Sequence, residues 1–326
     1  MVDHTIAISS PRGKQNPSRA KSETSLSTGP NSNSATHFDM MSMSVFSNSP
    51  MAVKFALVFA LAALVGCTPR NVLSVAPYEP PTQRYAAIVV NANSGEVLHE
   101  TRADAIRFPA SLTKMMTLHI IFDEMKRHAI TKNTLIPVSA KAAARPASKL
   151  WLKPNSTITV DEAIQALAIK SANDVAYAVA EFFSGSKAAF ARRMTRRARE
   201  LGLKSTVFRN ASGLPDKGQV TTARDMARLG VSLKKRHARH FHYFSRNSFV
   251  FRGKTIRGHN RVLGRLNGAN GIKTGYTRAS GYNLVTSVSR SGKTIVGVIL
   301  GEDSGRLRDQ HMVQLLEAIM PRAGIR

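Results

Sequence analysis

Three short polar motifs lie in a fixed order along the 326-residue chain: Ser111-Leu112-Thr113-Lys114, Ser171-Ala172-Asn173 and Lys273-Thr274-Gly275. A serine hydroxyl is a weak nucleophile that needs a neighbouring base, so a serine with two lysines describes an acyl-transfer site. No single motif suffices, because serine-x-x-lysine recurs at residues 18–21, 184–187 and 232–235, and serine-x-asparagine recurs at 245–247. The order, the wide spacing and the surroundings of the three motifs favour the catalytic interpretation.

The first motif predicts a nucleophile and its base. Lys114 follows Ser111 by three positions, which face the same side of a helix, so the lysine amine can reach the serine hydroxyl. To accept the serine proton this amine must be partly neutral, and both burial and a second cation lower a lysine pKa. Lys273 would supply that cation. Ser171 would relay the proton between the two lysines and the leaving amine.

The other motif residues have the chemistry to bind a peptide substrate. Asn173 offers an amide that would hold the substrate backbone, while Lys273 and Thr274 offer a charge and a hydroxyl to a terminal carboxylate. Gly275 would leave room for the substrate to lie along a strand as an added β-strand. Structural roles compete with these assignments, because Ser111 and Asn173 are both residue types that cap helix N-termini.

Hydrophobic periodicity predicts the elements that position these motifs. Residues 86–90 and 96–100 form a hairpin around an Asn-Ser-Gly turn, and further strands are expected at 248–251, 282–288 and 294–300. A helix begins at Ser111 with its apolar side chains on one face. More helices are expected over residues 161–170, 174–183, 186–201, 222–235 and 304–320.

Strands at both ends of the domain, with helices between them, imply an α/β (α+β) fold. Its antiparallel sheet is assembled from the two ends, and a helical insertion packs beside it. Ser111 would then open a helix against the sheet, Ser171 and Asn173 would lie in a loop of the insertion, and Lys273 would lie on or just before a sheet strand. Three separate segments would thus form one cleft.

The motifs and their surroundings resemble the penicillin-interacting serine enzymes, and specifically the D-alanyl-D-alanine carboxypeptidases of the low-molecular-mass penicillin-binding group. The resemblance covers roughly residues 85–320. It is carried by the three motifs and by four neighbouring stretches: Arg107-Phe108-Pro109-Ala110-Ser111, Gly213-Leu214-Pro215-Asp216, Thr221-Thr222-Ala223-Arg224-Asp225-Met226 and Gly271-Ile272-Lys273-Thr274-Gly275-Tyr276-Thr277.

This resemblance implies a β-lactamase/transpeptidase-like fold with a sheet of about five strands and an oxyanion hole made by the backbone N–H groups of Ser111 and Tyr276. It implies removal of the terminal D-alanine from peptidoglycan stem peptides, covalent inhibition by β-lactam antibiotics, and no metal or organic cofactor. A D,D-endopeptidase uses the same chemistry and remains an alternative. A β-lactamase is less favoured, because Glu181 and Glu200 lack the local pattern of its deacylating glutamate. A wall-binding protein that keeps only the scaffold is a further alternative.

The chain departs from the commonest family pattern at three positions. Alanine occupies Ala172, where aspartate or glycine is frequent, Tyr276 stands where some relatives have histidine, and Ser212 stands where many carry histidine. These changes predict altered catalytic rates and substrate preferences, with the activity itself retained. Arg224 is either a surface residue paired with Asp225 or a residue of the cleft.

The N-terminal quarter of the chain predicts export. Residues 1–50 are a disordered leader or precede the true start, and residues 51–67 form a lipoprotein signal peptide whose apolar run, 55–66, ends at the lone cysteine, Cys67. Lipidation of Cys67 would anchor the protein in a membrane, outer if the host is Gram-negative, facing the periplasm. Residues 68–84 would be an extended tether, and residues 85–326 the catalytic domain.

The net charge of +27 is large for an enzyme. Basic clusters on two predicted helices would attract anionic lipids or phosphates, and nucleic acid is not expected as a partner because no recognition motif accompanies them. The clusters comprise Arg192, Arg193, Arg196, Arg197 and Arg199, and Lys234, Lys235, Arg236 and Arg239. The histidines near the second cluster, His237, His240 and His242, are expected on a solvated face and not in a metal site.

Overall fold

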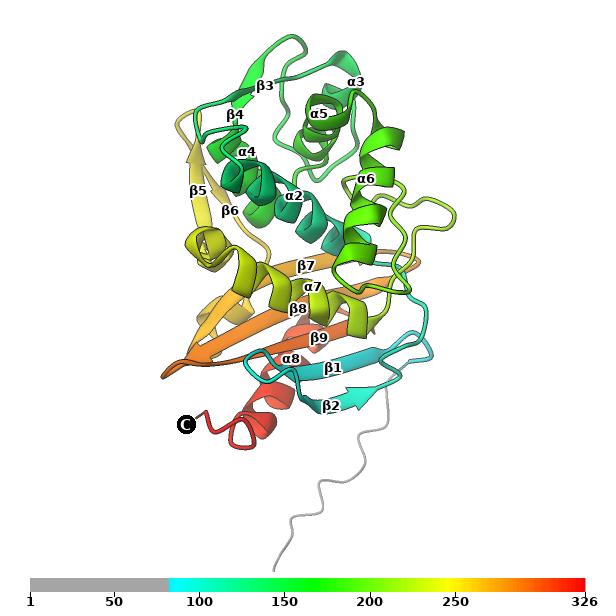
Figure 1. Cartoon of the computed structure of the whole chain (residues 1–326), viewed down its shortest axis with the longest axis vertical. Helices are drawn as coiled ribbons and strands as arrows, with labels where there is room; N and C mark the ends of the chain where they lie inside the picture. The colour runs from blue at the N-terminus through cyan, green and yellow to red at the C-terminus, as the bar shows by residue number, and fades with distance from the viewer. Residues whose placement is uncertain (1–81, 326) are drawn as a thin grey trace, which may run out of the picture. The chain divides into compact units, whose positions relative to one another are not determined.

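The computed structural model describes residues 82–325, and the predicted leader, signal peptide, Cys67 and nearly all of the tether lie outside this range. A five-stranded antiparallel sheet runs through the domain in the order β2-β1-β9-β8-β7 (Figure 1). The strands are β1 (Ala86–Asn91), β2 (Val97–Thr101), β7 (Ala269–Thr277), β8 (Gly281–Arg290) and β9 (Lys293–Glu302). The predicted sheet, built from both ends of the domain, is confirmed.

Helices cover the two faces of this sheet. Helix α7 (Ala223–Arg236) contacts β1, β8 and β9, and α8 (Gly305–Ile319) contacts β8 and β9. The side chains of β1 alternate between two hydrophobic cores, because Ile88 packs with the α7 side and Val89 with the α8 side. This alternation follows from the two-residue period of a strand buried on both faces.

The predicted helical insertion lies on the α7 side of the sheet (Figure 1). Its helices are α2 (Lys114–Lys126), α3 (Ala140–Ala143), α4 (Val160–Gln165), α5 (Asn173–Ser184) and α6 (Lys187–Glu200). Five of the described helices begin at side-chain caps that the sequence offers, from Ser139, Thr159, Ser186, Thr222 and Ser304. Short irregular helices η1 (Ala110–Thr113), η2 (Ala166–Lys170), η3 (Ala238–Ser245) and η4 (Val262–Gly264) connect these elements.

Helix α2 departs from the expected one-sided pattern. Every residue from Lys114 to Phe122 is buried, because the helix passes through the middle of the insertion with neighbours on all sides. The sequence also did not predict two small antiparallel pairs, β3 (Leu135–Pro137) with β4 (Thr157–Thr159), and β6 (Lys254–Arg257) beside the predicted β5 (Ser248–Phe251). None of the helices described is both long and apolar enough to cross a bilayer.

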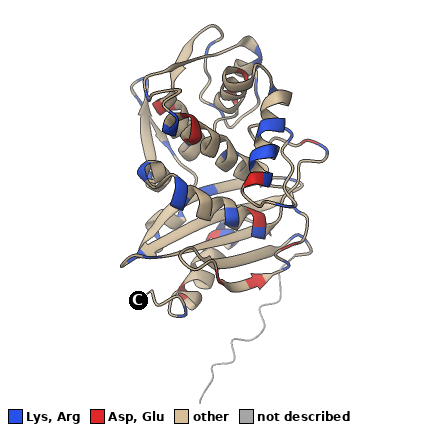
Figure 2. Cartoon of the chain, in the orientation of Figure 1, with Lys and Arg blue, Asp and Glu red and all other residues tan. Residues whose placement is uncertain are grey.

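Lysines and arginines gather along α6 and the C-terminal end of α7 (Figure 2). Part of this charge is structural, since Arg193 pairs with Glu124 and Arg197 with Asp123, both on α2. Arg192 and Arg196 are exposed on α6. The expected attraction of this surface for anionic lipids stays a prediction.

Candidate active site

Ser111 lies in the tight turn η1, immediately before α2. Its side chain makes no helix-capping hydrogen bond, so the interpretation of Ser111 as an N-cap is wrong. Strand β7 packs closely against this turn. A Cβ atom at Gly275 would lie 3.1 Å from the Ser111 nitrogen and 3.2 Å from the Leu112 nitrogen. Glycine is therefore needed here for the contact between the strand and the turn, in addition to any room it gives a substrate.

Lys114 begins α2 and turns back onto Ser111, as its spacing predicted. Its Nζ donates to Ser111 Oγ at 3.2 Å, to Asn173 Oδ1 at 2.8 Å and to the carbonyl oxygen of Ser212 at 2.5 Å. The residue is completely buried. Burial lowers the pKa of the Lys114 amine well below its usual value, and the charge of Lys273 lowers it further while Asp174 opposes both. This is the electrostatic setting that a lysine base requires.

The Ser212 loop, which accepts a bond from Lys114, is held by a local hydrogen-bond network. Asn210 Oδ1 accepts from the Ser212 nitrogen, the Ser212 hydroxyl and the Gly213 nitrogen. The Ala211 carbonyl in turn accepts from Thr117 Oγ1 on α2 at 2.8 Å. Ser212 thus contributes to the site through its backbone, a contribution that side-chain motifs do not reveal.

The second motif bridges η2 and α5. Ser171 has a left-handed backbone, with φ 63°, and its Oγ is buried with no hydrogen-bond partner among the described residues. Asn173 is the first residue of α5, and Ala172 occupies the capping position, so the alternative that Asn173 caps this helix is wrong. Its Nδ2 donates to the Pro146 carbonyl at 3.0 Å. Both ends of the Asn173 amide are therefore fixed, which orients Lys114.

Lys273 lies on β7, the open edge strand of the sheet, as the third motif predicted. It is almost fully buried, and its Nζ donates to the Thr274 carbonyl at 2.8 Å. Burial lowers the pKa of Lys273 to about 7, and the charge of Arg308 contributes to this shift. A change of its charge near neutral pH would therefore alter the electrostatics around Lys114.

A cleft of about 630 Å³ opens over these residues. Six of the predicted site residues line it: Ser111, Ser171, Asn173, Thr274, Gly275 and Tyr276. The Tyr276 ring is half exposed and lies against Tyr282, with 4.2 Å between ring centroids. The structure thus brings the three motifs together around one cavity.

The same cleft has lining residues that the sequence analysis missed. Arg308 of α8 and His259, before η4, both face it, and Arg308 pairs with Asp309 through a 2.6 Å contact. The pKa of His259 is lowered, mainly by burial and next by the charge of Lys273. No spacing signal marks either residue, because they come from loops and a helix outside the three motifs.

Two other expectations are corrected. Arg224 does not line this cleft and does not pair with Asp225; it forms ion pairs with Glu100 and Asp104 on the far side of α7. His237 is buried and not on a solvated face, whereas His242 is exposed as expected. The burial of His237 follows from the packing of its ring against His119 and Phe122 of α2.

A serine held by a buried lysine, beneath a cleft edged by a β-strand, defines the penicillin-interacting class of serine enzymes. Residues 74–304 match the D-alanyl-D-alanine carboxypeptidase family of serine peptidases, and the chain belongs to that family. It is thus a serine-type hydrolase of the low-molecular-mass penicillin-binding group.

Individual relatives support this assignment. The D-alanyl-D-alanine carboxypeptidase DacA of Escherichia coli K12 is 32% identical over 274 residues, which cover 82% of this chain and 68% of that protein. DacC of the same organism is 34% identical over 244 residues, covering 73% of this chain and 61% of that protein. The chain therefore spans about two thirds of the length of these relatives.

Solved structures show the same fold. The crystal structure of the D-alanyl-D-alanine carboxypeptidase DacD from Francisella tularensis matches with a TM-score of 0.70 at 28% sequence identity. The match covers 71% of this chain and 69% of the DacD chain. Penicillin-binding protein 5 from Haemophilus influenzae has a TM-score of 0.69 at 29% identity, over 73% of this chain and 71% of its own. The predicted transpeptidase-like fold is confirmed.

Proposed function

We propose that this protein removes the terminal D-alanine from peptidoglycan pentapeptide stems through an acyl-enzyme on Ser111. The observation that carries the proposal is the 3.2 Å hydrogen bond between Lys114 Nζ and Ser111 Oγ, made by a lysine whose pKa burial holds far below its usual value. A neutral amine in this position is a general base matched to a serine nucleophile.

The reaction proceeds in two steps, acylation of Ser111 and deacylation by water. Ser111 Oγ attacks the carbonyl carbon of the D-alanyl-D-alanine peptide bond and gives its proton to Lys114. The C–N bond breaks as the leaving amine takes a proton through Ser171, and D-alanine departs. Water then attacks the acyl-enzyme ester, loses a proton to the same base and restores the Ser111 hydroxyl.

Two further groups of atoms stabilise the reacting peptide. The backbone N–H groups of Ser111 and Tyr276 act on the developing oxyanion, a contribution of about 3 kcal/mol per donor in comparable sites. The packing of Gly275 against the Ser111 nitrogen supports this pairing, because it brings β7 beside the nucleophile turn. Lys273 and Thr274 bind the terminal carboxylate, and Arg308 adds positive charge to the same cleft.

Product analysis tests the reaction. The full chain is incubated with a pentapeptide muropeptide, and the products are weighed by mass spectrometry. We expect tetrapeptide and free D-alanine from the wild type and from Ser184→Ala, which alters a serine of a chance serine-x-x-lysine spacing. Ser111→Ala should leave the pentapeptide unaltered. Unaltered pentapeptide with the wild type under several conditions would refute the proposal.

Endopeptidase activity is a second candidate, because a cross-linked dimer presents the same D-alanyl bond. The 630 Å³ cleft is lined by Thr274, Gly275 and Tyr276 of the edge strand β7, along which a larger substrate could lie. Parallel assays with the pentapeptide and with a purified cross-linked dimer compare the two activities. Faster cleavage of the dimer than of the pentapeptide would show that endopeptidase activity is the main activity of the protein.

Penicillin should form a long-lived adduct with this protein. Glu181 accepts a hydrogen bond from Ser139, Glu200 pairs with Arg197, and neither is among the residues that line the cleft. Within residues 82–325, therefore, no glutamate lines the cleft in a position to deacylate the drug as in a β-lactamase. Fluorescent penicillin should label the wild type and not Ser111→Ala. Rapid turnover would indicate a β-lactamase, and no label at all a non-catalytic wall-binding protein.

We also propose a lipid anchor at Cys67 that holds the enzyme in the periplasm. The apolar run before the cysteine supports an export signal, and two or three acyl chains give stable anchoring. Thr68 follows the cysteine where an aspartate would retain the protein in the inner membrane, which favours the outer membrane. Fractionation of cells that express wild type or Cys67→Ser tests the anchor. Equal solubility of both in the periplasm would exclude it.

A further inference from the structure

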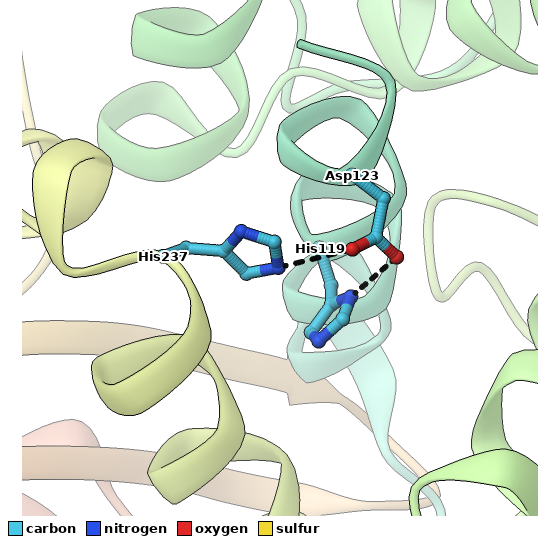
Figure 3. A group of neighbouring side chains, drawn as sticks. All are labelled: His119, Asp123 and His237. Carbon is cyan, nitrogen blue, oxygen red and sulfur yellow. Dashed lines mark ion pairs between the residues drawn. The ribbon is translucent and has the colours of Figure 1, made fainter. Parts of the chain in front are cut away.

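A second polar cluster lies on the same helix as Lys114. His119 and Asp123 are one turn apart on α2, and His237 immediately follows α7 (Figure 3). Both histidines are buried, with side-chain exposures of 0% and 2%, and Asp123 has 17%. Three potential metal ligands that converge in a buried place are unusual, because burial of polar groups is unfavourable unless they are well paired.

The distances between the three side chains are those of ligands around one ion. His119 Nδ1 lies 3.2 Å from Asp123 Oδ2, and His237 Nε2 lies 3.5 Å from Asp123 Oδ1. The potential ligand atoms all lie within 4.8 Å of one another. Four ligands at the usual zinc–nitrogen distance stand about 3.3 Å apart in a tetrahedron, so only small shifts would enclose an ion.

A second observation points to a missing ligand. His119 Nδ1 and His237 Nε2 are buried, and neither makes a hydrogen bond with correct geometry within the part of the chain described here. Both nitrogens nevertheless face the same carboxylate (Figure 3). Buried nitrogens that lie near a carboxylate without a well-aligned hydrogen bond require an explanation, and a bound ion would satisfy both at once.

The surroundings fix the orientation of the cluster. His119 Nε2 contacts the Ser232 hydroxyl at 3.0 Å, which is the kind of outer contact that orients a ligating imidazole. Arg197 contacts both oxygens of the same carboxylate, with Nε 2.9 Å from Asp123 Oδ2 and Nη2 3.2 Å from Oδ1. The arginine charge opposes a dication, so binding should be weaker than in a closed site of four thiolate or imidazole ligands.

We propose that His119, Asp123 and His237 form a structural binding site for a divalent transition-metal ion, Zn²⁺ being the best match. Two imidazoles and a carboxylate are a ligand set that zinc accepts, and imidazole disfavours calcium and magnesium. The ion would join α2 to the end of α7, well inside the domain and apart from the catalytic cleft. It would brace α2, which begins with Lys114 directly after the Ser111 turn, and take no part in the reaction.

Zinc titration of the full chain tests this site. The protein is freed of metals with a chelator, dialysed and titrated with ZnCl₂ by calorimetry. We expect one zinc per chain at this site, with affinity at least tenfold weaker in His237→Gln and in Asp123→Asn. His242→Gln is the matched control, because it removes an exposed histidine near the cluster and should leave the affinity unchanged.

Two measurements separate metal ligation from simple packing. Co²⁺ added in place of zinc should give the visible absorption of a tetrahedral site in the wild type and in His242→Gln, and not in His237→Gln. Zinc should raise the melting temperature of the wild type by a few degrees and leave that of His237→Gln unchanged. If His237→Gln does not fold by circular dichroism, His119→Gln replaces it.

The proposal is overturned by either of two results. One is the absence of saturable zinc binding to the wild type. The other is equal binding by the folded His237→Gln or His119→Gln and by His242→Gln, because it would place the zinc on other side chains.

Discussion

Helix α2 carries two buried polar groups that differ in what surrounds them. At its first turn, Lys114 is hydrogen-bonded on three sides and stands beside Ser111 at the floor of an open cleft. Farther along the same helix, His119 and Asp123 lie beside His237, and both histidines are buried. The first group leaves a reactive hydroxyl exposed to substrate, whereas the second is surrounded by other protein side chains, including Ser232 and Arg197.

The comparison teaches that burial alone does not identify a catalytic group. A catalytic group needs a perturbed pKa together with access to a reacting partner. Lys114 meets both conditions through Ser111, while the histidine cluster lacks the access. We therefore expect substitutions in the two groups to affect different properties, with catalysis impaired at one end of α2 and stability at the other.

The largest effect should come from Lys114→Met, which keeps the size of the side chain and removes the amine. Acylation by penicillin should slow on the order of a thousandfold or more, because the nucleophile loses its base. The melting temperature should fall only modestly, because the lost hydrogen bonds to Asn173 and Ser212 are offset in part by removal of the cost of burying an amine. Lys126→Met, at the exposed end of the same helix, is the control. A large loss of stability in Lys114→Met would remove the contrast between the two groups.

A backbone contact next to the nucleophile gives the next largest effect. Gly213 has φ +87°, and a Cβ atom there would stand 1.8 Å from the Ala110 carbonyl oxygen. Gly95 has nearly the same φ, +86°, with nothing within 4 Å of its Cβ position. Gly213→Ala should therefore lower the free energy of unfolding by about 2 kcal/mol or more beyond the loss in Gly95→Ala. Both substitutions introduce the same backbone strain, and only Gly213→Ala adds a clash. Urea unfolding of both variants measures the difference, and equal losses would contradict this account.

Asp123→Asn should show the opposite profile to Lys114→Met. It leaves Arg197 and the two histidines without the carboxylate, so the free energy of unfolding should fall by about 1–3 kcal/mol. Acylation of the folded protein should stay within a few-fold of wild type. The control is Asp104→Asn, which breaks an exposed ion pair with Arg224 and should cost less than about 1 kcal/mol. Strong loss of acylation in folded Asp123→Asn would show that the two groups are coupled.

The smallest effect concerns the pH profile of acylation. The rate should fall on the acid side as Lys114 gains a proton, and on the alkaline side as Lys273, whose pKa is about 7, loses its charge. Arg308 lowers that pKa, so Arg308→Gln should move the alkaline limb to higher pH. Arg306→Gln alters a second arginine of the cleft and should change the rate without moving the limb. An unmoved limb in Arg308→Gln would exclude Arg308 as the cause.

Much of the fold and site follows from local sequence patterns. The hairpin β1–β2, the caps at Thr159 and Thr222 and the strands at the C-terminal end depend on residues close together in sequence. The three motifs are likewise local, and their order shows that they belong together. The contact between Lys114 and Ser111 follows from helix geometry alone.

The rest depends on long-range packing that periodicity does not encode. The spacing of the apolar side chains of α2 predicts one buried face, yet His119 and Thr117 on the same helix are buried as well, because partners reach them from α7 and from the Ser212 loop. The basic residues around His237 likewise predict a solvated segment, whereas contact with His119 of α2 buries its ring. Arg308 joins the cleft from the last helix, and nothing in its own segment indicates this position.

The pairing of β1 with β9 has a consequence for how the protein is made. Thr82 Oγ1 donates to the Gly301 carbonyl across 219 residues, and β1 lies between β2 and β9. A nascent chain can form its first hairpin early, but the central strand has no second neighbour until synthesis is almost complete. Such distant pairing delays folding. Under the export proposed above, the chain would cross the membrane before its last strands could complete the sheet, and the domain would close only on the far side.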